Sequence, residues 1–211
     1  MTKVLVLGAN GAIARLVRDD LKTQTDIQLT LFLRNAERLN DVDASREKVI
    51  DGDALDQTAI DNAMVGQDIV YANLGGKADQ AAANIVASMQ KNHVKRLIFI
   101  TSLGIYDEVP GKFGEWNNQM IGQSLEPYRQ AANIIENSPL DYTILRPAWL
   151  TNKNEVDYET TQKGESFKGT EVSRKSVATY LVSLINEPSV DTRASVGLDK
   201  PGSEGNKPSF Y

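Results

Sequence analysis

The stretch that decides the fold is Val4-Leu5-Val6-Leu7-Gly8-Ala9-Asn10-Gly11-Ala12-Ile13-Ala14. It opens with a short apolar run and leads into a segment whose apolar residues, at helical spacing, are Ile13, Leu16, Val17 and Leu21. Between the two, Gly8, Gly11 and Ala14 form the pattern G-x-x-G-x-x-A. We therefore predict a strand, a tight turn and a helix, the opening unit of a parallel α/β sheet.

Each small residue of this turn has a physical reason. Gly8 permits the tight turn, Gly11 lets the backbone approach a pyrophosphate, and a small residue at position 14 lets helix and strand pack closely. Backbone N–H groups at the start of a helix, together with the helix dipole, then hold the anion. The residues expected to contact a dinucleotide here are Gly8, Asn10, Gly11, Ala12 and Ile13.

The rest of the chain alternates short apolar runs with amphipathic stretches. The predicted strands are Val4–Leu7, Gln28–Leu33, Lys48–Ile50, Ile69–Tyr71, Leu97–Ile100 and Tyr142–Leu145. Such nearly continuous apolar runs are typical of strands that helices cover on both faces. We predict one α/β domain over residues 1–211, with a Rossmann-like doubly wound parallel sheet and a small C-terminal substrate-loop region.

Three segments lack this alternation. Residues 104–125 read as a long insertion before a helix at about 126–137, and residues 151–169 read as a second irregular stretch. In a doubly wound sheet both would overhang the carboxyl ends of the strands, where ligands bind. The tail 200–211, with two prolines and two glycines, is expected to be loosely ordered, although Phe210 and Tyr211 could dock.

The end of the second strand favours one cofactor over another. A site for NAD(H) usually has an acidic residue there, which binds the ribose 2′-hydroxyl. In this chain Arg34 follows the strand directly, Glu37 is the first acidic residue, and Arg38 follows it. A guanidinium offers a 2′-phosphate a planar, charge-assisted fork. NADP(H) is therefore favoured over NAD(H); the alternative is that both arginines are ordinary surface charges.

Composition excludes several kinds of chemistry. The chain lacks cysteine, so disulfides, thiolate metal sites and cysteine nucleophiles are impossible, and His93 is the only histidine. The formal net charge of -5 gives no reason to expect nucleic acid or an anionic membrane as a partner. No apolar run is long enough for a membrane span, and no signal-peptide pattern precedes Val4. We expect a cytoplasmic protein without a metal site; its oligomeric state stays open.

Further along, several motifs resemble those of one family. They are Asp51-Gly52-Asp53-Ala54-Leu55-Asp56, Tyr71-Ala72-Asn73-Leu74-Gly75-Gly76, Ile100-Thr101-Ser102, Leu140-Asp141-Tyr142-Thr143-Ile144-Leu145-Arg146-Pro147-Ala148-Trp149-Leu150 and Val172-Ser173-Arg174-Lys175-Ser176-Val177-Ala178. The chain resembles the atypical short-chain dehydrogenases/reductases over nearly its whole length. Within that group it is most similar to NAD(P)H-binding proteins related to biliverdin reductase B/flavin reductase and to NmrA-like proteins.

The resemblance implies further cofactor contacts. Asp53 and Ala54 would border the adenine, and Leu74 and Gly75 would run beside the ribose and phosphates. Near the nicotinamide the resemblance places Thr101, Ser102, Pro147 and Ala148. For each of these positions the alternative is simple packing at a strand end.

One feature of typical family members is missing. Their Tyr-x-x-x-Lys motif passes a proton to or from the substrate, yet none of the seven tyrosines here has lysine four residues later. Weaker candidates for catalysis are Ser102, Tyr106 and Tyr128. A tyrosine with an ordinary pKa near 10 is a poor acid-base group unless its surroundings tune it.

Two hypotheses follow from this gap. In the first, the protein is an NADPH-dependent reductase that transfers hydride to an easily reduced small-molecule acceptor, such as a flavin, a quinone or a linear tetrapyrrole. In the second, it binds NADP(H) with little chemistry, as a redox-sensing or regulatory protein of NmrA type. Sugar-nucleotide epimerase or dehydratase chemistry is disfavoured, because the proton relay is absent and only about 60 residues follow Arg146.

Overall fold

A computed structural model describes all 211 residues and contains one large sheet. The chain order of its strands is β1 (Thr2–Leu7), β2 (Ile27–Leu33), β3 (Glu47–Asp51), β4 (Ile69–Ala72), β5 (Arg96–Ile100), β6 (Asp141–Pro147), β8 (Glu159–Gln162) and β10 (Ala194–Asp199). In space they are ordered β3-β2-β1-β4-β5-β6-β10-β8, and only β8 runs antiparallel to its neighbour. A separate pair joins β7 (Trp149–Thr151) to β9 (Glu171–Ser173).

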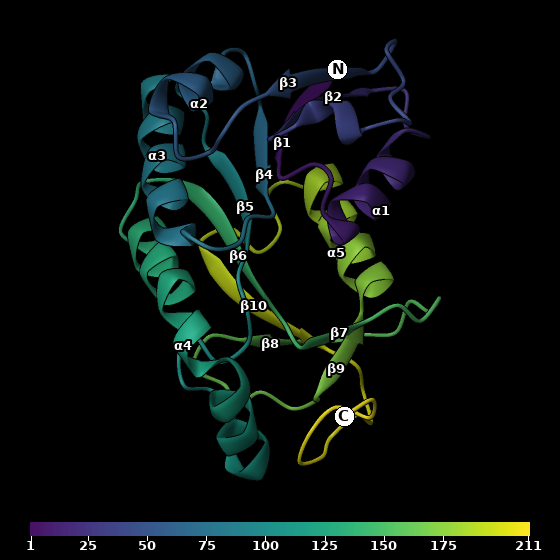
Figure 1. Cartoon of the computed structure of the whole chain (residues 1–211), viewed down its shortest axis with the longest axis vertical. Helices are drawn as coiled ribbons and strands as arrows, with labels where there is room; N and C mark the ends of the chain where they lie inside the picture. Colours follow the sequence, from purple (N-terminus) through teal and green to yellow (C-terminus); the bar gives the residue numbers. More distant parts are fainter.

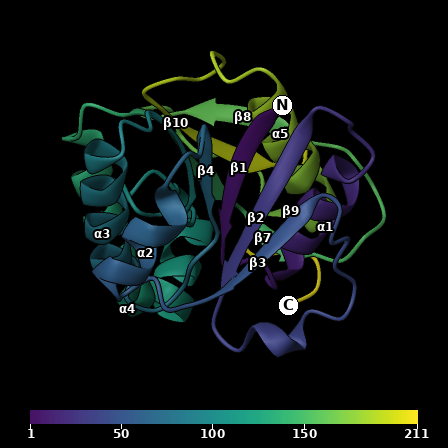
Figure 2. The same ribbon diagram turned by 90° about the horizontal axis from the view of Figure 1, so that it is seen from above.

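Helices cover both faces of the sheet (Figures 1 and 2). On one face lie α1 (Ala12–Leu21) and α5 (Arg174–Asn186), and on the other lie α2 (Gln57–Met64), α3 (Ala78–Lys91) and α4 (Gly111–Glu136). A short 3-10 helix, η1 (Ala36–Arg38), follows β2. Each face has its own hydrophobic core, and β4 and β5 between them are buried at every position. The predicted doubly wound α/β fold is confirmed.

Local signals predicted most elements well. All six predicted strands form, and they are β1 to β6. Asp56 caps α2 by accepting the backbone N–H groups of Thr58 and Ala59, and Ser173 caps α5 through the N–H of Ser176. A short polar side chain at the N-cap satisfies donors that have no partner inside the helix.

The prediction of an irregular segment over residues 104–125 was wrong. Helix α4 begins at Gly111 and is 26 residues long, with Pro127 in its interior. Its buried face includes Phe113 and Asn117, one turn apart, and the Asn117 side chain accepts a hydrogen bond from the Trp149 indole (2.9 Å). A buried asparagine that bonds to a distant tryptophan interrupts the apolar stripe that a sequence pattern could reveal.

Two other segments form long-range contacts that their composition does not indicate. The stretch 151–169 contains β8, which pairs with the unpredicted strand β10. In the tail, the N–H of Lys200 bonds to the Glu171 carbonyl, and the N–H of Ser209 bonds to the Glu171 carboxylate. Long-range hydrogen bonds thus order a segment whose composition is that of a loop. None of the helices combines the length and the apolar composition that a membrane span requires.

Candidate functional site

An open cavity of about 570 Å³ lies where β1 to β4 end. The topology explains its place, because the chain builds β1, β2 and β3 in one direction and then returns to the other side of β1 with β4. Its volume lies within the usual range for small-ligand and cofactor sites. The predicted residues that line it are Gly8, Asn10, Gly11, Arg34, Arg38, Asp53, Ala54, Leu74 and Gly75.

The glycine turn packs closely against the loop after β4. Gly8 has a φ of +80°, and a β-carbon on it would lie 2.2 Å from the carbonyl oxygen of Asn73. A β-carbon on Gly11 would lie 2.7 Å from the Asn73 side-chain nitrogen. Asn73, which also lines the cavity, was not among the predicted contacts. Its position directly after a strand, between landmark residues, was the signal available in the sequence.

The start of α1 is open to an anion. Its N-cap, Gly11, contributes no side-chain hydrogen bond, so no capping group occupies the first-turn N–H donors. Ala12 itself lines a neighbouring groove with Arg15 and Arg174, and the Ile13 side chain is buried in the core. Only the backbone of these two residues is therefore available to a ligand in the cavity.

Positive charge gathers at the β2 end of the cavity. The Arg34 side chain is 73% exposed, and its nearest carboxylate is that of Asp53 at 3.9 Å. Such a long, exposed ion pair holds the side chain weakly. Arg38 donates to the carbonyls of Arg34 (2.8 Å) and Asn35 (3.3 Å), which orients its guanidinium and leaves its charge uncompensated. Both guanidinium groups can therefore meet an anionic ligand.

The predicted residues at the ends of β5 and β6 do not line this cavity. The Thr101 hydroxyl donates to the Leu145 carbonyl (2.9 Å), and the Ala148 N–H donates to the Leu198 carbonyl (2.8 Å). The Pro147 carbonyl accepts the Leu103 N–H. These contacts join strands, while Ser102 stays half-buried beside them. The contacts of these four residues with a nicotinamide stay a prediction.

The two candidate tyrosines lie in different places. A β-carbon on Gly75, a cavity-lining residue, would lie 3.5 Å from the Tyr128 hydroxyl. Tyr106 instead donates to Glu136 (2.8 Å) beneath the Lys163 ammonium and does not line the cavity. Burial raises the pKa of both phenols. Neither tyrosine lines the cavity, but Tyr128 lies beside one of its lining residues.

A Rossmann fold with a glycine turn and a basic cavity at the switch point defines a class of nucleotide-binding proteins. Consistent with this, the chain matches the family described as "NAD(P)H-binding" over residues 8–188. The chain belongs to this NAD(P)H-binding family, and the predicted resemblance to short-chain dehydrogenases/reductases is confirmed. It therefore has the fold and cofactor class of reductase- and epimerase-like proteins.

Several known proteins are similar over their whole length. A Rossmann-fold NAD(P)-binding family protein from Shigella flexneri is 44% identical, with a TM-score of 0.87 and full coverage of both chains. A short-chain dehydrogenase/reductase from Veillonella parvula, solved in complex with NADP, is 30% identical, with a TM-score of 0.92 and 99% of each chain covered. An "uncharacterized sugar epimerase", YhfK of Bacillus subtilis, is 25% identical over 91% of this chain and 92% of its own.

Proposed function

We propose that this protein is an NADPH-dependent reductase that acts on an easily reduced acceptor, such as a flavin or a quinone. The observation that carries the proposal is the charge of the cavity. Its lining includes three basic residues, Arg34, Arg38 and Lys77, against one acidic residue, Asp53. The whole chain has a net charge of -5, so the positive lining is local. A ligand with several phosphates suits such a site.

The residues present fit a bound NADPH. The open N–H groups at the start of α1 would hold the pyrophosphate, and Arg34 and Arg38 would hold the 2′-phosphate. Asp53 and Ala54 would border the adenine. The similarity to a relative solved with NADP supports this choice. When bound, the reduced nicotinamide supplies the hydride.

The acid-base groups of the chain limit which classes of acceptor the protein can reduce. Burial raises the pKa of Tyr128, and no neighbouring cation offsets that shift. The phenol can therefore donate a hydrogen bond but does not ionise near neutral pH. Acceptors such as flavins and quinones need little acid catalysis from the protein, because water can supply the proton. This reasoning favours them over aldehydes, ketones or sugars, whose carbonyl oxygen must gain a proton on reduction.

The absence of a Tyr-x-x-x-Lys proton relay also supports a second candidate function. In it, the protein is a redox sensor that binds NADP(H) and turns it over slowly or not at all. Sugar epimerisation, the activity in the name of the Bacillus relative, requires proton handling that Tyr128 alone does not supply. Oxidation of NADPH by purified protein with a panel of flavins and quinones separates these candidates. Tight NADPH binding without turnover by any acceptor would favour the sensor.

Arg34→Asp tests the cofactor preference. We expect the Kd for NADPH to rise roughly 10- to 100-fold, because a charge-assisted hydrogen bond to phosphate contributes about 1.5–3 kcal/mol. The Kd for NADH should change by less than about threefold. Quenching or enhancement of nicotinamide fluorescence measures both constants. Lys95→Asp is the control, since this exposed lysine lies at the opposite, amino end of β5. Equal losses for both cofactors would contradict the 2′-phosphate assignment.

A further inference from the structure

Two tryptophans meet beside the carboxyl ends of the strands. Trp116 of α4 and Trp149 of β7 have ring centroids 4.8 Å apart, and Phe113 stacks on Trp116 at 6.1 Å. The hydrogen bond from the Trp149 indole to Asn117 (2.9 Å) fixes the Trp149 ring. We call Trp116 and Trp149 the aromatic shelf. Both indoles are only partly buried by the core beneath them.

Tyr211 covers the aromatic shelf. Its ring centroid lies 5.0 Å from that of Trp116 and 5.1 Å from that of Trp149, in T-shaped arrangements. In Figure 1 the end of the chain, β7, β9 and the first half of α4 lie together below the sheet. Tyr211 nevertheless stays 50% exposed, as does Phe210 beside it. The cover is thus thin and open to solvent on its outer side.

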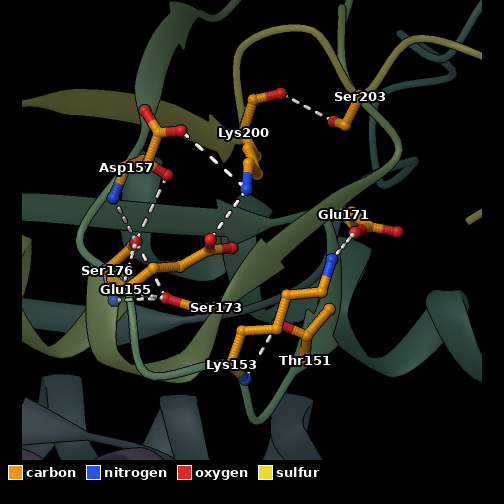
Figure 3. Close-up of polar contacts among 9 residues, drawn as sticks. All are labelled: Thr151, Lys153, Glu155, Asp157, Glu171, Ser173, Ser176, Lys200 and Ser203. Carbon is orange, nitrogen blue, oxygen red and sulfur yellow. Dashed lines mark hydrogen bonds and ion pairs between the residues drawn. The ribbon is translucent and has the colours of Figure 1, made fainter. Parts of the chain in front are cut away.

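The tail that carries Tyr211 is anchored firmly up to Ser209. The buried Glu171 carboxylate accepts the Lys153 ammonium (2.8 Å) on one oxygen and the Ser209 N–H (2.7 Å) on the other. Figure 3 shows Glu171 with Lys153, and Lys200 and Ser203 bonded to each other at the turn that starts the tail. Beyond Ser209, one turn hydrogen bond and the ring contacts hold Tyr211.

The position of the aromatic shelf relates it to the cofactor. The cavity that fits the adenine half lies at the ends of β1 to β4, so the nicotinamide half extends toward β5 and β6. Trp149 comes two residues after Pro147, the last residue of β6. The aromatic shelf therefore overhangs the side of the sheet edge where an acceptor would have to approach.

We infer that the aromatic shelf is the surface on which a planar conjugated acceptor stacks, and that Tyr211 covers it until the acceptor displaces this ring. The inference rests on the proposed reductase function, because it assigns the acceptor's place in that reaction. A fused ring system can lie flat on an indole, whereas the Tyr211 ring is inclined to the two indoles by 68° and 81°. The anchor at Ser209 keeps the displaced ring nearby, so the tail acts as an exchangeable cover.

Intrinsic fluorescence tests the cover directly, because the chain has only these two tryptophans. In Tyr211→Ala, the emission maximum of the ligand-free protein should shift to longer wavelength as water reaches the indoles. Tyr211→Phe keeps the ring and should retain the emission of the unaltered protein. An unchanged maximum in Tyr211→Ala would overturn the assignment of Tyr211 as a cover.

Acceptor binding tests the exchange. With the protein saturated with NADP⁺, flavin emission reports the Kd for riboflavin, and competition with riboflavin reports the Kd for menadione. Tyr211→Ala should tighten binding roughly 3- to 10-fold, Tyr211→Phe should leave it unchanged, and Trp116→Leu should weaken it. Unchanged or weaker binding in Tyr211→Ala, or no binding of either probe, would overturn the inference. These constants need no turnover, whereas a failure of the reductase proposal appears as the absence of NADPH oxidation.

Discussion

At the scale of single residues, Gly8 carries two independent constraints. Its φ of +80° is a conformation that side chains with a β-carbon rarely adopt, and the space beside it is taken by the Asn73 carbonyl. The first constraint belongs to the turn itself. The second arises because the loop after β4 closes on the turn, which brings the two walls of the cavity together.

Gly8→Ala should therefore lower the free energy of unfolding by more than backbone strain alone would. We expect the free energy of unfolding to fall by roughly 3 kcal/mol or more, and cofactor binding to be lost, because the loop carrying Asn73 must move. Gly66→Ala is a matched control: its φ is +71°, but nothing lies within 4 Å of the added carbon, so about 1 kcal/mol should be lost. Urea unfolding measures both, and equal losses would show that the Asn73 contact does not matter.

Arg146 shows how a motif residue links elements. It is fully buried on β6, forms an ion pair with Glu108, and donates to the Thr161 and Ser195 carbonyls on β8 and β10. Glu108 in turn accepts the N–H of Gly104. One side chain thus joins three strands and the loop after β5. A buried charge requires this degree of pairing, which explains the arginine in the Leu140–Leu150 motif.

At the scale of elements, two of the three glycines of α4, Gly114 and Gly122, lie in contrasting surroundings. A β-carbon on Gly114 would lie 2.1 Å from the Val109 carbonyl oxygen, which makes the first turn of α4 fit tightly on the preceding loop. On Gly122 the nearest atom would be the Asn118 β-carbon at 3.8 Å, an ordinary contact. Packing therefore requires a glycine at position 114. At position 122 no close contact requires one, and the backbone entropy of glycine lowers the stability of the helix there.

Substitution of these glycines should have opposite effects. Gly122→Ala should raise the free energy of unfolding by up to about 1 kcal/mol, because alanine favours a helix more than glycine does. Gly114→Ala should lower it by roughly 2 kcal/mol, because the backbone must shift to admit the methyl group. Thermal unfolding of the two variants beside the unaltered protein provides the measurement. Stabilisation by both substitutions would mean that α4 does not pack on Val109.

At the scale of the whole molecule, Asp199 ties stability to pH. It is buried on β10, and one carboxylate oxygen accepts the Gly169 N–H (2.7 Å) while the other has no partner. Burial raises its pKa from 3.8 to about 6. The unfolded chain therefore releases this proton first as the pH rises. The contribution of Asp199 to stability falls between about pH 4 and pH 6 and stays low above that.

Asp199→Asn should be more stable than the unaltered protein at pH 7, by an amount on the order of 2 kcal/mol. The asparagine oxygen can still accept the Gly169 N–H, and it has no charge to desolvate. The difference should vanish below pH 4, where aspartate is protonated in both states. Asp61 and Glu171 have lowered pKa values and act in the opposite sense, so the two proteins must be compared at each pH. A constant difference from pH 4 to pH 7 would contradict this account.

The elements and contacts that depend on residues close together in the sequence could be predicted, and those that depend on distant residues could not. The glycine turn, β1 to β6 and the caps at Asp56 and Ser173 follow from residues close together in the chain. β10 escaped prediction because Gly197 interrupts its apolar pattern. The structure explains that glycine, since a β-carbon there would lie 2.6 Å from the Phe167 ring. Nothing near Gly197 in the sequence points to that ring.

By itself, then, the sequence determined the class of fold, the turn at Gly8–Ala14 and the basic end of the site at Arg34 and Arg38. Backbone conformation, periodicity and charge are properties of short stretches, and a sequence displays them directly. Only the tertiary structure decided that Asn73 closes the turn, that Tyr106 faces Glu136 while Tyr128 lies beside Gly75, and that Tyr211 covers the tryptophans. These contacts join residues far apart in the chain, and packing of the whole molecule selects them.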